Sequence, residues 1–163
     1  MAAVLATALF SGSVAVQAEQ PVLVNVKRMS LDIALKIAQT AIKECRKRGV
    51  QISVTVLDRG AHPQVVLRDV LAMDISVPIS RQKAHTALAF NSPTSQLEDR
   101  FKGPFSVGKF PGLLMSAGGV PVHAGGAIIG GVGVSGAPSG KIDEACAKAG
   151  VDAVQADLDM AGM

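Results

Sequence analysis

The sequence predicts an α+β domain in which helices are layered on an antiparallel sheet. Helix-like and strand-like segments follow one another in the order helix, two strands, helix, two strands, helix, which is typical of layered α+β folds. Each pair of strand-like segments is joined by turn residues, as expected for antiparallel hairpins. The chain has 163 residues, 48% of them apolar, and this indicates one domain with one sizeable core.

The composition narrows the class of ligand. The chain contains no Trp or Tyr and only 5 Phe, so the core is built from aliphatic residues. Platforms on which the bases of single-stranded nucleic acid stack are therefore not expected. The net charge of +3 is mild and does not indicate a nucleic-acid partner.

The first 18 residues have the pattern of a signal peptide. They carry no charged side chain, are apolar from Ala2 to Phe10, and end in Val16-Gln17-Ala18, which suits a signal peptidase. We therefore expect residues 1–18 to be removed and residues 19–163 to form a single periplasmic or secreted domain. The apolar stretch is too short to span a bilayer as a helix, so no transmembrane segment is expected in the mature protein. The alternative is a retained apolar arm that packs on a partner subunit.

The first half of the domain predicts a helix and a hairpin. After an extended piece at residues 22–26, Ser30 suits the N-cap of a helix that runs to Arg48 and ends at Gly49. Residues 51–57 alternate apolar and polar side chains. The turn Asp58-Arg59-Gly60 then leads to a returning strand at 64–68.

The second half repeats the pattern. Pro78 suits the first turn of a helix that reaches about Phe90. Residues 94–101 can add a turn or two of helix, and residues 103–112 form a loop. A second hairpin pairs residues 120–123 with 127–135, and a helix from Lys141 to about Leu158 ends the domain.

Two cysteines, Cys45 and Cys146, lie on the apolar stripes of the first and last predicted helices. Neither belongs to a Cys/His metal-binding spacing. Two interpretations remain open. The cysteines are buried thiols, or they form a disulfide in an oxidising compartment.

Several blocks of the chain resemble the GlcG/HbpS family of haem-binding proteins over roughly residues 29–154. These blocks are SLDIALKIAQTAIKECRKRGVQISVTVLDRGAH, ISRQKAHTALAF, PGLLMSAGGVPV, GGAIIGGVGVSG and DEACAKAG. The resemblance implies a profilin-like sandwich with a five-stranded antiparallel sheet flanked by helices. It also implies a higher homo-oligomer and haem as the cofactor.

The glycine-rich strand contains a literal GxGxxG between Gly131 and Gly136. Dinucleotide-binding folds place these glycines in the turn between a strand and a helix, whereas here they alternate with valines inside a predicted strand. We interpret Gly131 and Gly133 as positions where another backbone or a flat ligand approaches the sheet closely.

Three histidines are candidate ligands for haem iron. His85 lies on the helix face opposite the apolar stripe, so it is either solvated or presented to a ligand or a neighbouring subunit. His62 follows the first hairpin turn, where an exposed turn residue is the plain alternative. His123 ends a strand beside Gly125 and is expected to face solvent.

Lys83 lies on the helix stripe that faces the sheet, so its ammonium needs an explanation. The side chain can snorkel to the helix edge. Alternatively it pairs with Asp58, Asp74 or a haem propionate, because an unpaired buried charge is costly. Thr86 offers a hydroxyl beside it, and the resemblance supports a functional lysine in KAHTA.

The remaining acidic pairs are expected to be solvated. Glu98-Asp99 and Asp143-Glu144 are neighbours in sequence, so the two carboxylates of each pair do not share a helix face.

Three hypotheses follow from these features. The first is an exported, oligomeric haem- or tetrapyrrole-binding protein that uses His85, Lys83, Thr86 and the glycine strand. The second is a lyase or isomerase that acts on a small carboxylated compound, with Lys83 and Asp58 as candidate catalytic groups. The third is an accessory subunit of a larger assembly.

Overall fold

A computed structural model describes residues 21–162, so residues 1–18 with the predicted signal peptide lie outside the described part of the chain. The elements are α1 (Leu31–Lys47), β1 (Ser53–Asp58), β2 (Pro63–Arg68), α2 (Ser76–Phe90), β3 (Gly119–Ala124), β4 (Ala127–Ser135), α3 (Gly140–Asp152) and α4 (Gln155–Gly162), with 3-10 turns at Thr94–Leu97 and Val107–Lys109. No helix within residues 21–162 has the length and apolar character needed to cross a bilayer.

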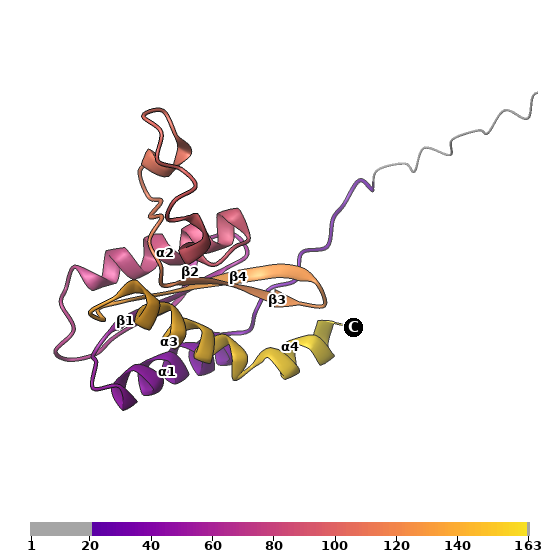
Figure 1. Cartoon of the computed structure of the whole chain (residues 1–163). Helices are drawn as coiled ribbons and strands as arrows, with labels where there is room; N and C mark the ends of the chain where they lie inside the picture. The colour runs from indigo at the N-terminus through magenta and orange to yellow at the C-terminus, as the bar shows by residue number, and fades with distance from the viewer. Residues whose placement is uncertain (1–20, 163) are drawn as a thin grey trace, which may run out of the picture.

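The predicted α+β fold with an antiparallel sheet is confirmed. The strand order is β2-β1-β4-β3, and every neighbouring pair is antiparallel. Helices α1, α3 and α4 lie on one face of the sheet and α2 on the other (Figure 1). The expectation of five strands is wrong, because the described residues form a sheet of four. The remaining extended segment, residues 22–26, pairs with no strand, and the side chain of Val22 is 98% exposed.

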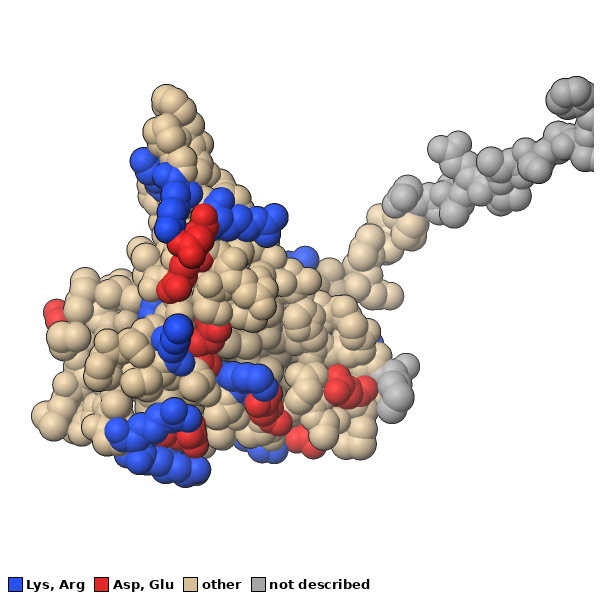
Figure 2. All heavy atoms as spheres, viewed as in Figure 1, with Lys and Arg blue, Asp and Glu red and all other residues tan. Residues whose placement is uncertain are grey.

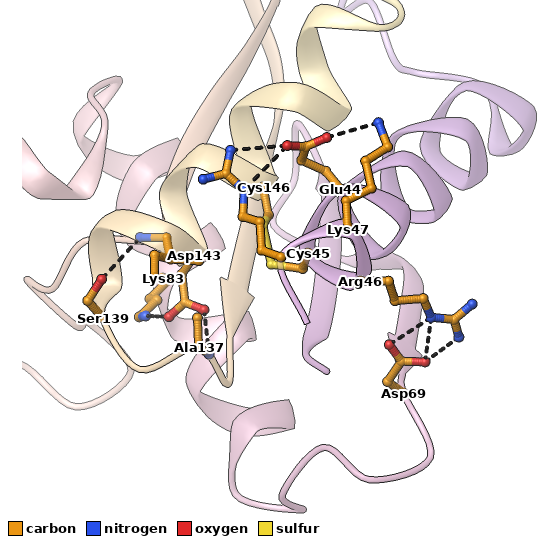
Figure 3. Close-up of a disulfide and its surroundings, with 12 residues drawn as sticks. Glu44, Cys45, Arg46, Lys47, Asp69, Lys83, Ala137, Ser139, Asp143 and Cys146 are labelled. Atoms are coloured by element: carbon orange, nitrogen blue, oxygen red, sulfur yellow. Dashed lines mark hydrogen bonds and ion pairs between the residues drawn. A yellow bond between two sulfur atoms is a disulfide. The ribbon is translucent and has the colours of Figure 1, made fainter. Parts of the chain in front are cut away.

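The face toward α1 and α3 carries the main apolar core. Valines at alternate positions of β1 and β4 point to this face, as the period-2 pattern predicts, and pack on Ala and Ile side chains of α1. Ser30 caps α1 by accepting a hydrogen bond from the Ile33 N–H, as expected. A disulfide joins Cys45 of α1 to Cys146 of α3, with a Cα–Cα distance of 5.6 Å (Figure 3). Of the two interpretations of these cysteines, buried thiols or a disulfide, the structure shows the disulfide.

The face toward α2 carries several small residues, which bring the helix close to the sheet, beside a small apolar cluster of Leu57 with Ala84 and Leu88. A Cβ atom at Gly133 would lie 2.0 Å from the Ser80 carbonyl oxygen, and one at Gly131 would lie 2.6 Å from the Ala84 carbonyl oxygen. Hydroxyl groups of Thr55 and Ser80 lie 2.8 Å apart across the same interface. Gly131 and Gly133 therefore accommodate the α2 backbone, so neither position faces a ligand.

The final helix differs from the prediction, because two helices replace the single helix expected from Lys141 to Leu158. The chain turns at Ala153 and Val154, where the Val154 N–H bonds to the Val151 carbonyl. Val154 is 1% and Leu158 6% exposed, so the break allows both side chains to reach the core.

The segment between α2 and β3 projects from the body of the domain on the α2 side (Figure 1). This segment contains the fully exposed Phe105. Figure 2 shows basic and acidic side chains interspersed over the face in view, with several of them at the base of this projection. Two parts of this segment line the candidate site described below, namely its first residue, Asn91, and its return around Gly112.

Candidate functional site

Two adjacent cavities lie between α2 and the β1–β2 turn and share two lining residues, Ala61 and His85. The first has a volume of about 340 Å³ and is lined by Leu57, Ala61, Pro78, Arg81, Gln82, His85 and Gly112. The second has a volume of about 350 Å³ and is lined by Arg59, Gly60, Ala61, His85, Leu88, Ala89, Asn91 and Ile128. We call the two cavities together the His85 groove. Each is within the roughly 300–1,000 Å³ typical of small-molecule sites.

His85 is half-buried between the two cavities, which favours presentation to a ligand over full solvation. Its Nδ1 atom lies 3.3 Å from the carbonyl oxygen of Gly112. Because a carbonyl only accepts, Nδ1 carries the hydrogen of this bond, and in the neutral ring the lone pair is then on Nε2. Metal-bound histidines are commonly held in this way, with the other ring nitrogen donating to a backbone carbonyl.

Thr86 positions the loop that holds His85. Its hydroxyl donates to the Gln82 carbonyl and accepts a 2.8 Å bond from the Leu114 N–H. Gly112, two residues earlier, has φ +92, a conformation that favours glycine. Thr86 is fully buried and lines neither cavity, so it acts on the site through the loop.

Lys83 lies away from the groove in a buried ion pair. Its Nζ is 2.8 Å from Oδ2 of Asp143, and the two side chains are 5% and 4% exposed (Figure 3). Of the two alternatives for Lys83, the structure shows pairing with a carboxylate and not snorkelling, but the partner is Asp143 and neither Asp58 nor Asp74. Gly118 makes room for the lysine, since a Cβ there would lie 2.8 Å from Nζ.

Asp143 is the partner of Lys83 that sequence reasoning missed, because this aspartate was expected to be solvated. The first turn of α3 faces inward, and Asp143 also accepts a 3.0 Å bond from the Ala137 N–H. Burial raises the pKa of the Asp143 carboxyl, and the Lys83 ammonium opposes this shift. The pair joins α2 to α3, which lie on opposite faces of the sheet. The sequence did contain one signal of a buried partner, because Lys83 is a charged residue on the stripe of α2 that faces the sheet.

The neighbouring acidic residues also depart in part from expectation. Glu144 accepts hydrogen bonds from the backbone N–H groups of Ser95 and Gly118, at 3.0 and 3.2 Å. Glu98 accepts a 2.8 Å bond from the Ala117 N–H. Asp99 is solvated as expected, with its side chain 88% exposed. These carboxylates fix loops and do not line the His85 groove.

Asp58 holds the turn that forms one wall of the groove. Burial by itself would raise the pKa of this carboxyl, but the N–H groups of His62 and Gly60 and the charges of His62 and Arg28 outweigh burial and lower it. The N–H groups of Gly60 and His62 lie 2.8 and 2.9 Å from Oδ1. The carboxylate is thus occupied by the turn and is not directed at a ligand.

His62 and His123 are not brought to His85. The His62 side chain is 74% exposed and lies beside Asp58. His123 bonds through Nε2 to the Asn91 side chain at 2.7 Å, and neither histidine lines a cavity of the groove. Within residues 21–162, no three His, Cys, Asp or Glu side chains group to hold a metal ion. A metal at His85 would therefore need further ligands from a cofactor.

Within residues 21–162, the groove beside α2 presents one histidine, His85, whose Nε2 has no hydrogen-bond partner. Residues 29–152 match the family model described as haem degrading protein HbpS-like, and the chain belongs to this HbpS-like family. The family predicted from the sequence blocks is thus confirmed.

Known relatives agree with this assignment. Protein GlcG of Escherichia coli (strain K12) is 34% identical over 108 residues, which cover 66% of this chain and 81% of GlcG. A double mutant of Streptomyces reticuli HbpS is similar in structure, with a TM-score of 0.78, 38% identity, and coverage of 88% of this chain and 98% of HbpS. The crystal structure of a PduOC:heme complex shares the fold, with a TM-score of 0.72, 23% identity, and coverage of 78% of this chain and 95% of PduOC.

Proposed function

We propose that this protein is an exported, oligomeric protein that binds haem or a related tetrapyrrole for capture, storage or sensing. The observation that carries the proposal is His85. Its Nδ1 is bonded to the Gly112 carbonyl, and its Nε2 is free of protein partners among the described residues. A neutral imidazole nitrogen at a groove wall is a common axial ligand for haem iron.

The groove suits a flat, largely apolar cofactor. Its walls include Leu57, Pro78, Leu88 and Ile128, which can pack on a macrocycle, and the iron would supply a coordination position for His85. Asp58 and Thr86 act indirectly, by holding the turn and the loop on either side of His85.

The relatives support a haem ligand. The family is described as haem degrading, and the PduOC structure with the same fold is a complex with heme. These descriptions belong to the relatives, and the ligand of this chain is our proposal.

Export and assembly rest on separate observations. The signal-peptide pattern of residues 1–18 supports export, and the Cys45–Cys146 disulfide is typical of oxidising compartments. Large apolar side chains are exposed on three separate segments and are the candidates for contacts between subunits. These side chains include Leu23, Val70, Leu71, Phe105 and Phe110.

The lyase or isomerase alternative is less favoured, because the Lys83 ammonium pairs with Asp143 and lies away from the His85 groove. The accessory-subunit hypothesis remains a prediction, tested by assembly with and without residues 1–18.

The test is a haemin titration of residues 19–163, followed in the Soret region. We expect a saturable, shifted Soret band in the wild type that is lost in His85→Ala and kept in His123→Ala, the matched control. In His85→Gly, added imidazole should restore the band. A wild type without a saturable band would refute haem binding, and an unchanged His85→Ala band would refute the ligand assignment.

Two further measurements address export and assembly. The intact mass of protein recovered from the periplasm or medium should begin at Glu19, and light scattering should give a mass of several subunits. A cytoplasmic protein that retains residues 1–18, or a monomer at every concentration, would contradict the respective part of the proposal.

A further inference from the structure

Two arginines differ from all the others in the described part of the chain. Arg28, Arg46 and Arg48 form ion pairs, Arg68 donates to the Ala72 carbonyl, and Arg100 lies over the Phe101 ring. Within residues 21–162, Arg59 and Arg81 have no ion pair, hydrogen bond or ring contact of this kind. Their guanidinium groups are therefore available to a ligand.

The same two arginines flank His85. Arg81 lines the first cavity of the His85 groove and Arg59 lines the second, while His85 lines both. Arg81 is one helical turn before His85 on α2, and Arg59 comes from the turn between β1 and β2. Both side chains line the groove and are exposed to solvent, so we place them at its mouth.

The groove contains no compensating negative charge. None of the residues that line either cavity is acidic. The nearest carboxylate in sequence, Asp58, is occupied by the N–H groups of Gly60 and His62 and by Arg28. The mouth therefore favours a ligand with negative groups at its edge.

We propose that Arg59 and Arg81 bind the carboxylate groups of the ligand and make the groove selective for a tetrapyrrole with free propionates. The guanidinium group matches a carboxylate in charge and in planar, bidentate geometry. Esterified or amidated side chains lack the charge and one of the two equivalent acceptors. This inference rests on the proposed function, since it places the ligand at His85.

The test compares haemin with haemin dimethyl ester in the wild type, Arg59→Gln, Arg81→Gln and the double variant. Arg100→Gln is the matched control, because Arg100 is exposed and lines neither cavity. Each groove variant should raise the Kd for haemin about tenfold, as expected for loss of a charge-assisted bond. The Kd for the ester should already be raised in the wild type and should change little in the variants.

The outcomes separate this inference from the proposed function. A wild type that binds haemin together with a double variant of unchanged Kd would overturn the inference alone. Equal weakening for haemin and the ester would also overturn it, because it would indicate altered packing in place of carboxylate binding. A wild type that binds neither compound would overturn the proposed function and the inference with it.

Discussion

The buried Lys83–Asp143 pair leads to a quantitative prediction about stability. Lys83→Met removes the ammonium and leaves the Asp143 carboxylate without its charged partner. The lysine and aspartate side chains are only 5% and 4% exposed, so solvent screens the lost charge little. Removing one partner of a buried ion pair costs about 3–5 kcal/mol. For a domain of this size that corresponds to a fall in Tm of roughly 6–20 °C.

Removing both charges should cost less than removing the lysine alone. In Lys83→Met/Asp143→Asn no buried charge is left, and the Asn oxygen can still accept the Ala137 N–H. We therefore expect the double variant to recover at least half of the stability lost in Lys83→Met. Lys148→Met is the control, since the Lys148–Asp152 pair has side chains 67% and 57% exposed. Such an exposed pair contributes at most about 1 kcal/mol.

Thermal and guanidinium denaturation should be followed by circular dichroism, because the chain contains no Trp or Tyr to report by fluorescence. A Lys83→Met variant that lost no more stability than Lys148→Met would show that the buried pair does not stabilise the fold. Asp143→Asn alone completes the double-mutant cycle. A double variant that lost the sum of the losses in Lys83→Met and Asp143→Asn would also count against the pair, since that would show no coupling between Lys83 and Asp143.

Three further predictions concern the disulfide, the glycine strand and Asp58. The disulfide joins residues with a sequence separation of 101, so it restricts the unfolded chain strongly. Cys45→Ser/Cys146→Ser should therefore lose about 2–5 kcal/mol of unfolding free energy, measured by denaturation. Equal stability of this variant and the wild type would contradict this prediction. Gly133→Ala should lose about 1–3 kcal/mol or more of unfolding free energy, because its Cβ would meet the Ser80 carbonyl. Gly103→Ala is the control and should be neutral in the same denaturation assay, because the space around Gly103 is open. The lowered pKa of Asp58 means that its contribution to stability is present above the ordinary carboxyl pKa and is lost as pH falls through the folded-state pKa. Asp58→Asn should therefore flatten the decline in Tm below about pH 4, and an acid limb as steep as that of the wild type would be evidence against this role.

The parts of the fold set by local signals could be predicted from the sequence. Ser30 caps α1 as expected, and the alternation of glycine with valine over residues 131–134 correctly predicted a strand in place of a nucleotide-binding turn. Local patterns did not reveal the break at Ala153 and Val154. The break allows the Leu158 side chain to reach the core. Where the core lies relative to this helix depends on how the helices pack on the sheet, which local sequence patterns do not show.

The candidate site was predicted only in part, because its contacts join distant segments. His85 was identified from its helix face, but its bond to Gly112 depends on the return of the projecting segment. The position of Lys83 indicated a buried partner, yet only the packing of α3 beside the sheet identified Asp143. Arg59 joins the groove through the β1–β2 turn, which sequence spacing does not place next to α2.

A crystal structure of residues 19–163 with haemin would decide the assignment of the site. The account predicts iron bound to Nε2 of His85, Nδ1 still bonded to Gly112, and the propionates at Arg59 and Arg81. Haem held away from the groove, or iron bound to another side chain while His85 stays free, would contradict it.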